Sequence, residues 1–246
     1  MPDYIFTGSE TSVGIDGCKG EWIAVAISDK AFEVDKYKTI DEICEKYRTA
    51  DAFLIDIPIG LPESRDGFLK RPDNELRTKL GRKYSSVFNT PFRQIVYAPD
   101  AKRAWELNRE LEARQTPVSM MLCKAIKQVD TFLQNNPQWK NRLLESHPEY
   151  CFNLLNGGKS LDQSKLSREG LEIRIGILKN FFPDSRRVVD TYLKQYKSRK
   201  KADDVVDALC LAIAGRLGLE HGFKSIPGIP FKDGTGLNMQ VVVFNK

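Results

Sequence analysis

The amino-acid sequence predicts a mixed α/β fold whose core runs strand, strand, strand, helix, strand. Three apolar runs of strand length, at residues 13–17, 22–27 and 32–37, are joined by connections too short for a crossover helix, so they are expected to be antiparallel. A capped helix and a fourth apolar run, at residues 52–59, follow them. Most of the remaining chain has helical periodicity, which favours a mixed sheet flanked by helices.

The helix after the third strand has a clear start signal. Thr39 is the predicted N-cap, and Glu42 three residues later completes a capping box. Ile40 and Ile43 supply its apolar face. The strand that follows is apolar except for Asp56 and ends at a Gly-Leu-Pro turn.

The rest of the chain is predicted to be mostly helical. Helices are expected at residues 73–80, 100–114, 119–133, 167–182, 187–196 and 203–217, and short strands at 142–145 and 240–244. No internal repeat or low-complexity linker interrupts it. We therefore expect one domain over residues 1–246 with a helical insertion at about 63–140.

Charge and hydropathy exclude several classes of protein. The 246 residues include 38 Lys and Arg against 33 Asp and Glu, a formal net charge of +5. This mild excess permits a nucleic-acid partner without requiring one. No apolar stretch approaches the ~18 residues that span a bilayer, and no secretion signal opens the chain. We expect a cytoplasmic protein outside the membrane.

The number and spacing of cysteines and histidines limit which metal ions the protein could bind. The five cysteines are scattered without a C-x-x-C pair, which indicates reduced thiols, and His147 and His221 are the only histidines. A structural zinc site is therefore nearly excluded. Any metal must be held by carboxylates, which select hard cations such as Mg²⁺ or Mn²⁺.

Acids occur where a strand or helix should be apolar. Asp16 ends the first strand and Asp56 interrupts the fourth. Asp204 and Asp207 lie three residues apart on one face of the last long helix, and Asp203 is an alternative to Asp204 because i and i+4 also share a face. Several carboxylates buried together require a cation, and a divalent metal ion meets that need.

Each acid also has an ordinary structural explanation. Asp16 could form a turn before Gly17, and Asp56 could lie on a solvated strand edge. Asp203 and Asp204 could cap the last helix. Asp207 lies past the capping turn in an apolar sequence, so the four acids together favour a site more than any one does.

Five stretches spread over nearly the whole chain carry a resemblance to known proteins: Gly14-Ile15-Asp16-Gly17-Cys18-Lys19-Gly20-x-Trp22, Asp56-Ile57-Pro58-Ile59-Gly60-Leu61-Pro62, Ser85-Ser86-Val87-Phe88, Glu145-x-His147-Pro148-Glu149 and Asp203-Asp204-x-x-Asp207-Ala208. With the strand order, they resemble the RNase H-like superfamily. The last stretch is similar to the final helix of RuvC-type Holliday-junction resolvases. More closely, the chain resembles an uncharacterised family, the domain of unknown function numbered 429, described as predicted nucleases with an RNase H-like fold.

The resemblance implies a metal-dependent active site. Its metal ligands would be Asp16, Asp56, Asp204 and Asp207, holding two Mg²⁺ or Mn²⁺ ions for phosphodiester hydrolysis. Resolvases commonly carry Glu where this chain has Asp56.

Three neighbouring residues could contribute to the same chemistry. Glu145 or Glu149 could supply a further carboxylate, and His147 between them could shuttle a proton. Before Pro148, the histidine could equally serve packing or turn structure.

Basic residues provide candidate contacts to substrate phosphates, which supply most non-specific nucleic-acid affinity. Lys19 follows Asp16 closely, and the further candidates are Arg82, Lys83, Arg93 and Lys200. Such runs are more often solvated surface.

Three functions follow from these residues. The first is a metal-dependent nuclease acting on DNA or RNA. The second is a non-catalytic nucleic-acid-binding or scaffold protein that keeps the fold. The third is a hydrolase or transferase acting on a small phosphorylated molecule. The sequence leaves open the substrate, the oligomeric state and the pathway.

Overall fold

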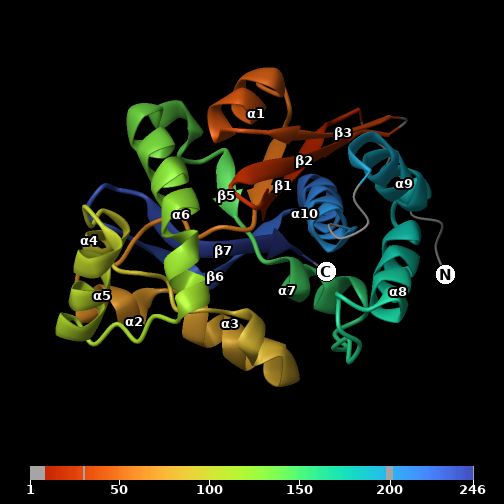
Figure 1. Ribbon diagram of the computed structural model, residues 1–246. Helices are drawn as coiled ribbons and strands as arrows, with labels where there is room; N and C mark the ends of the chain where they lie inside the picture. The colour runs from red at the N-terminus through yellow and green to blue at the C-terminus, as the bar shows by residue number, and fades with distance from the viewer. Residues whose placement is uncertain (1–8, 30, 198–201, 246) are drawn as a thin grey trace. The chain divides into compact units, whose positions relative to one another are not determined.

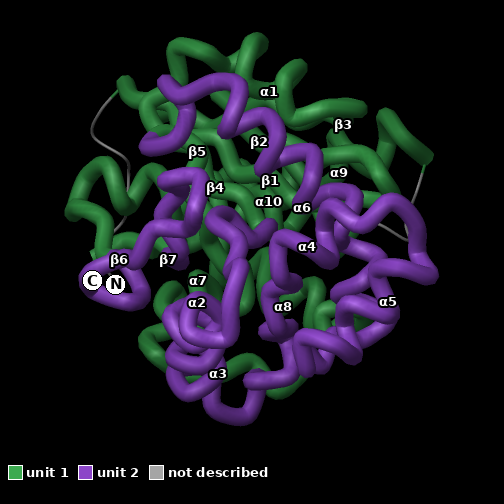
Figure 2. The backbone as a smooth tube through the Cα atoms, turned by 90° about the vertical axis from the view of Figure 1, so that its left-hand side faces the viewer, with its two compact units in different colours: residues 1–56, 142–224, 242–246 green, residues 57–141, 225–241 purple. Residues whose placement is uncertain are grey.

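A computed structural model describes residues 9–29, 31–197 and 202–245 of the chain (Figure 1). The chain divides into two compact units, coloured separately in Figure 2. Unit 1 comprises residues 1–56, 142–224 and 242–246. Unit 2 comprises residues 57–141 and 225–241, and includes the segment predicted as a helical insertion.

Unit 1 contains a five-stranded mixed sheet in the order β3-β2-β1-β4-β5. Its strands are β1 (Ser12–Cys18), β2 (Glu21–Ile27), β3 (Phe32–Tyr37), β4 (Ala52–Ile55) and β5 (Leu143–Glu145). The first three are antiparallel neighbours, while β4 pairs in parallel with both β1 and β5. The predicted mixed α/β fold is confirmed, and its strand order is consistent with an RNase H-like topology.

Two local features set the ends of these strands. Lys19 and Gly20 both have positive φ, 51° and 84°, as the two-residue turn between β1 and β2 requires. Strand β4 ends at Ile55, earlier than the predicted residue 59. Pro58 has no N–H to donate, and the Asp56 N–H makes a last hydrogen bond to the Ile15 carbonyl at 3.0 Å.

The long helix α10 (Ala202–His221) packs on the face of the sheet that carries Gly14. It is buried all round between Val205 and Gly218, as expected for a helix covered on every side. A Cβ on Gly14 would lie 2.0 Å from the Ala208 carbonyl oxygen. The α10 backbone can therefore approach β1 only because Gly14 has no side chain.

The described part of unit 1 also contains the helices α1 (Ile40–Lys46), α7 (Pro148–Leu155), α8 (Arg168–Lys179) and α9 (Ser185–Tyr196). Helix α1 lies on the side of the sheet opposite α10 (Figure 1). The Thr39 cap is confirmed, since its side chain accepts from the Glu42 N–H at 3.3 Å. Glu42 reaches back to the Lys38 N–H at 3.0 Å, so the predicted box is shifted by one residue. Helix α7 was not predicted.

Unit 2 consists of helices and most of a β-hairpin whose first and last residues belong to unit 1. Its helices are α2 (Arg65–Lys70), α3 (Asp73–Leu80), η1 (Gly81–Ser86), α4 (Arg93–Val96), α5 (Ala101–Glu110), α6 (Pro117–Asn135) and η2 (Pro137–Trp139). Phe68 and Phe92 stack at 5.5 Å between ring centroids in its core, beside Ile95 and Ala104.

The hairpin pairs β6 (Phe223–Lys232) with β7 (Asn238–Phe244). The sequence predicted only residues 240–244 of it. Pro227 and Pro230 concealed β6, because proline is tolerated only on strands with an unpaired edge, such as those of a two-stranded sheet. No described helix is both long enough and apolar enough to cross a membrane.

Candidate functional site

Three aspartates from three elements of unit 1 lie close together at one end of the sheet. The Asp56 N–H bonds to the Ile15 carbonyl, so the ends of β1 and β4 are adjacent. Side chains alternate along a strand, which puts Asp16 on the same face as Gly14, where α10 packs. Asp207 directly precedes Ala208, the α10 residue that contacts Gly14. The Asp207 side chain therefore lies near Asp16 at the same end of the sheet.

The electrostatics confirm that these carboxylates interact. Burial raises the pKa of Asp16 well above its usual range, and repulsion by Asp56 and then Asp207 raises it further. Burial raises the pKa of Asp207 to about 6 against the opposing attraction of Lys165. Burial also raises the pKa of Asp56, which His147 and Lys165 oppose. Carboxylates with pKa values raised in this way are characteristic of functional sites.

Asp204 and Asp203 have different surroundings. Asp204 lies within electrostatic range of Asp16 and contributes to its raised pKa. Asp203 instead lines a neighbouring groove. The structure thus favours Asp204 as the fourth carboxylate beside Asp16, Asp56 and Asp207. These four residues are called the carboxylate cluster below.

Lys165 is a cluster residue that the sequence analysis missed. Its ammonium nitrogen lies 2.6 Å from Oδ2 of Asp207, whose side chain is 4% exposed. Burial works to lower the pKa of Lys165, but attraction to Asp207, Asp16 and Asp56 outweighs it and raises the pKa. Lys165 is one of 38 basic residues and belongs to no motif, so only the tertiary structure reveals it.

The loop that carries Lys165 is fixed to the start of α8. The Ser167 side chain caps this helix by accepting from the Gly170 N–H at 3.0 Å, and donates to the Ser164 carbonyl at 2.8 Å. A Cβ on Gly170 would lie 2.1 Å from that same carbonyl oxygen. The close packing holds the Lys165 backbone in one place.

Glu149 is engaged by a buried arginine of α8. Arg174, whose side chain is 1% exposed, donates to both oxygens of Glu149 at 2.8 and 3.1 Å. It also donates to the Gln163 carbonyl at 3.2 Å, two residues before Lys165. Glu149 is therefore connected through Arg174 to the Lys165 loop.

Glu145 and His147 take different positions. Glu145 is in register with Ile55 on the neighbouring strand, so it lies on the face of the sheet opposite Asp16 and Asp56. Because of this strand pairing, the Glu145 side chain points away from the carboxylate cluster. His147 caps α7, its Nδ1 accepting from the Tyr150 N–H at 3.3 Å. In the neutral ring this contact places the proton on Nε2, and the ring lies within electrostatic range of Asp56.

A groove of about 660 Å³ opens beside Lys165, lined by residues of α8, α9 and the start of α10. Its walls carry charges of both signs beside the apolar side chains of Leu171 and Val189. The charged residues are Lys165, Arg168, Arg186, Glu172, Asp190 and Asp203. The volume is within the usual range for small-molecule sites. Lys165 is thus shared by the groove and the carboxylate cluster.

The chain matches a family model described as "Protein of unknown function (DUF429)" over residues 14–230. It belongs to this DUF429 family. The match includes every residue of the cluster and of the Lys165 loop. Comparisons with curated proteins and with solved structures found no match.

The basic residues predicted to bind phosphate are spread over both units of this DUF429 chain. Lys19 is exposed at the tip of the β1–β2 hairpin. Arg82 and Lys83 lie in η1 of unit 2, and Arg82 is exposed. Lys200 lies outside the described residues.

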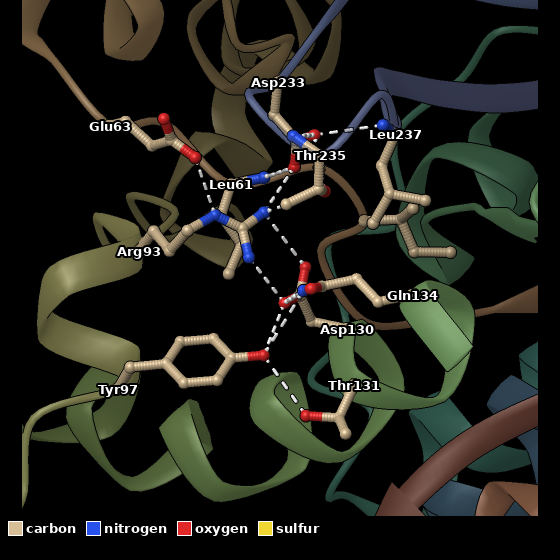
Figure 3. A network of polar contacts seen from close by, with 12 residues as sticks. Leu61, Glu63, Arg93, Tyr97, Asp130, Thr131, Gln134, Asp233, Thr235 and Leu237 are labelled. Atoms are coloured by element: carbon tan, nitrogen blue, oxygen red, sulfur yellow. Dashed lines mark hydrogen bonds and ion pairs between the residues drawn. The ribbon is translucent and has the colours of Figure 1, made fainter.

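Arg93, also predicted to contact phosphate, is surrounded by acids of unit 2. Its guanidinium donates to Glu63, Asp130 and Asp233 at 2.9, 2.6 and 2.6 Å (Figure 3). Asp130 also accepts from the Tyr97 hydroxyl at 2.6 Å. The side chain is only 15% exposed, and its ion pairs join separate segments of unit 2.

The carboxylates suit a hard divalent cation by their chemistry, since Mg²⁺ and Mn²⁺ prefer oxygen ligands. Within the described part of the chain, no group of three or more His, Cys, Asp or Glu side chains is arranged to hold a metal ion. Mg²⁺ usually takes only one or two carboxylates, with water and substrate phosphate oxygens as further ligands. Burial is the main cause of the raised pKa values of Asp16, Asp56 and Asp207, so a bound cation would stabilise the charged forms of these carboxylates. The donor set therefore fits a cation bound in this partly hydrated way.

Proposed function

We propose that this DUF429 protein is a divalent-metal-dependent nuclease that hydrolyses phosphodiester bonds at the carboxylate cluster. One observation carries the proposal. Asp16, Asp56 and Asp207, from β1, the end of β4 and α10, are gathered at one end of the sheet with raised pKa values. Bringing like charges together where solvation is poor lowers the free energy of unfolding. Groups held in this way are characteristic of functional sites, and a bound cation would offset the loss of stability.

The residues of the site would have separate roles in binding the cation and in acting on the substrate. Asp16, Asp56, Asp204 and Asp207 would hold Mg²⁺ or Mn²⁺. A bound ion of this kind activates water as a nucleophile and stabilises negative charge on phosphate oxygens. His147 would exchange a proton through Nε2; its interaction with Asp56 and the Tyr150 N–H contact at Nδ1 support this role.

The groove beside Lys165 suggests how substrate reaches the cluster. Lys165 and Arg168 can attract phosphates, while Leu171 and Val189 can contact a nucleobase or sugar. Lys19, in the turn that follows the strand carrying Asp16, could contact a phosphate further along an extended chain.

The groove also favours a second function on the same cluster, the hydrolysis or transfer of a group on a small phosphorylated molecule. Its volume suits such a ligand. The dependence of binding affinity on salt concentration distinguishes the two functions. Affinity for an extended nucleic acid falls steeply with salt, whereas affinity for a small ligand with one or two phosphates changes little.

The first experiment measures thermal unfolding against MnCl₂ and MgCl₂ for the wild type and for Asp207→Asn. A cation that binds only the folded state stabilises by about 2.7 kcal/mol at a hundredfold excess over its dissociation constant. We expect the melting temperature to rise by several degrees in the wild type and to stay unchanged in Asp207→Asn.

Cleavage is then assayed on single-stranded and duplex DNA and RNA, with Mn²⁺ or with a chelator. Metal-dependent cleavage that is lost in Asp207→Asn supports the nuclease. Nucleic-acid binding without cleavage on any of these substrates would instead favour the non-catalytic binding protein.

A further inference from the structure

Lys165, whose side chain is 42% exposed, places a positive charge beside the carboxylates. Its ammonium lies 2.6 Å from Asp207 and attracts Asp16 and Asp56 as well. One oxygen of Asp207, Oδ2, is thereby occupied by a donor. A metal ion at these carboxylates would have to share Asp207 with this ammonium or displace it.

Polar contacts hold the backbone of the loop that brings Lys165 to Asp207. Ser167 fixes it to the first turn of α8, and Arg174 holds the Gln163 carbonyl while pairing with Glu149. Arg174 is itself buried. The backbone on either side of Lys165 is therefore held by polar contacts that its movement would break.

We infer that the Lys165 ammonium takes the place of a second metal ion, so that the cluster binds one divalent cation together with this lysine. The inference rests on the proposed metal-dependent function and revises the number of ions that the resemblance implies. An ammonium and two divalent cations among four carboxylates would repel one another at short range, where solvent screens poorly. One divalent ion and Lys165 together provide three positive charges for the four carboxylates.

The same arrangement gives Lys165 a role toward substrate. It lines the groove as well as the cluster, so it can reach a phosphate oxygen from the groove side while it pairs with Asp207. An ammonium is a compact cation with three donors, and its geometry permits both contacts.

The test counts Mn²⁺ ions by electron paramagnetic resonance of the unbound ion during titration of the full chain. Wild type, Lys165→Met and Lys165→Arg are compared, and binding that persists in Asp207→Asn is subtracted as background. We expect one site-specific Mn²⁺ in the wild type and in Lys165→Arg, and two in Lys165→Met. The first ion should bind Lys165→Met about tenfold tighter or more, because a repelling charge has been removed.

The outcomes separate this inference from the proposed function. Two ions in the wild type overturn the role of Lys165 and leave the metal-dependent nuclease standing. One ion in both the wild type and Lys165→Met, with equal affinity, also overturns that role. No site-specific Mn²⁺ in any of the proteins overturns the inference and the proposed function together. If Lys165→Met does not fold, as judged by its melting curve, Lys165→Gln replaces it, and the wild-type count still decides between one ion and two.

Discussion

The ammonium nitrogen of Lys165 lies 2.6 Å from Oδ2 of Asp207, where β1, β4 and α10 bring buried carboxylates together. The lysine belongs to a loop, and the aspartate to the long helix that packs on the sheet. Through this ion pair, the carboxylate cluster has a positive charge supplied by the protein itself. The same lysine also lines the neighbouring groove.

Asp204→Asn should abolish the Mn²⁺-dependent rise in melting temperature, and Asp203→Asn should leave it intact. Asp204 lies within range of Asp16, whereas Asp203 lines the groove. The two substitutions remove the same charge from adjacent residues, so each is the control for the other. Equal loss in both variants would show that the helix terminus as a whole, and not one carboxylate, determines metal binding.

The stability of the metal-free protein should depend on pH through Asp207. Its pKa is raised to about 6, so the unfolded chain releases this proton at lower pH than the folded one. The Asp207 contribution to stability is full below pH 4, falls as pH rises, and is lost above about pH 6. Urea unfolding in a chelator should show the wild type losing stability relative to Asp207→Asn across this window. A difference that does not change with pH would contradict the prediction, and Asp41→Asn provides the control for an exposed carboxylate.

Gly14→Ala should destabilise the protein by about 3 kcal/mol or more, because the new Cβ would overlap the α10 backbone. Gly17→Ala, on the same strand, is the control, since its nearest neighbour would be the Trp22 ring at 3.9 Å. Chemical denaturation measures both. A Gly14→Ala protein of normal stability would mean that α10 can move away from β1 at little cost.

Arg174→Met should cost about 3–5 kcal/mol, because it leaves the Glu149 carboxylate with its partner removed. Arg187→Met, at an exposed position of α9, should cost little. Glu149→Gln distinguishes the two roles of that residue. A supporting role predicts lower stability with Mn²⁺ binding retained, whereas a metal-ligand role predicts lost binding at normal stability.

Arg93→Met should destabilise unit 2 by about 3–5 kcal/mol, since it leaves Asp130 and Asp233 buried without their shared cation. Tyr97→Phe removes one hydrogen bond to Asp130 and should cost about 1–3 kcal/mol. Exposed Arg109→Met is the control for loss of a surface arginine. Unchanged stability in Arg93→Met, with weakened nucleic-acid binding, would restore the phosphate-contact role predicted from sequence.

The sequence predicted the elements whose signals are local. Strand-length apolar runs with short connections predicted the β1–β2–β3 meander, and Thr39 predicted the start of α1. The acids Asp16, Asp56 and Asp207 were singled out because each interrupts an apolar stretch, and the structure brings them together. Local patterns failed where proline occurs in a strand, as in β6, and where a turn motif begins a helix, as in α7.

The sequence by itself therefore determined the mixed α/β fold and the acids of the candidate site, because apolar periodicity and its interruptions are visible along one chain. The tertiary structure alone decided which charges meet. Lys165 and Asp207 are 42 residues apart, Arg174 and Glu149 are 25 apart, and Arg93 and Asp233 are 140 apart. Side chains that distant in sequence carry no shared pattern, and their interaction depends on the packing of helices and strands that brings their ends together.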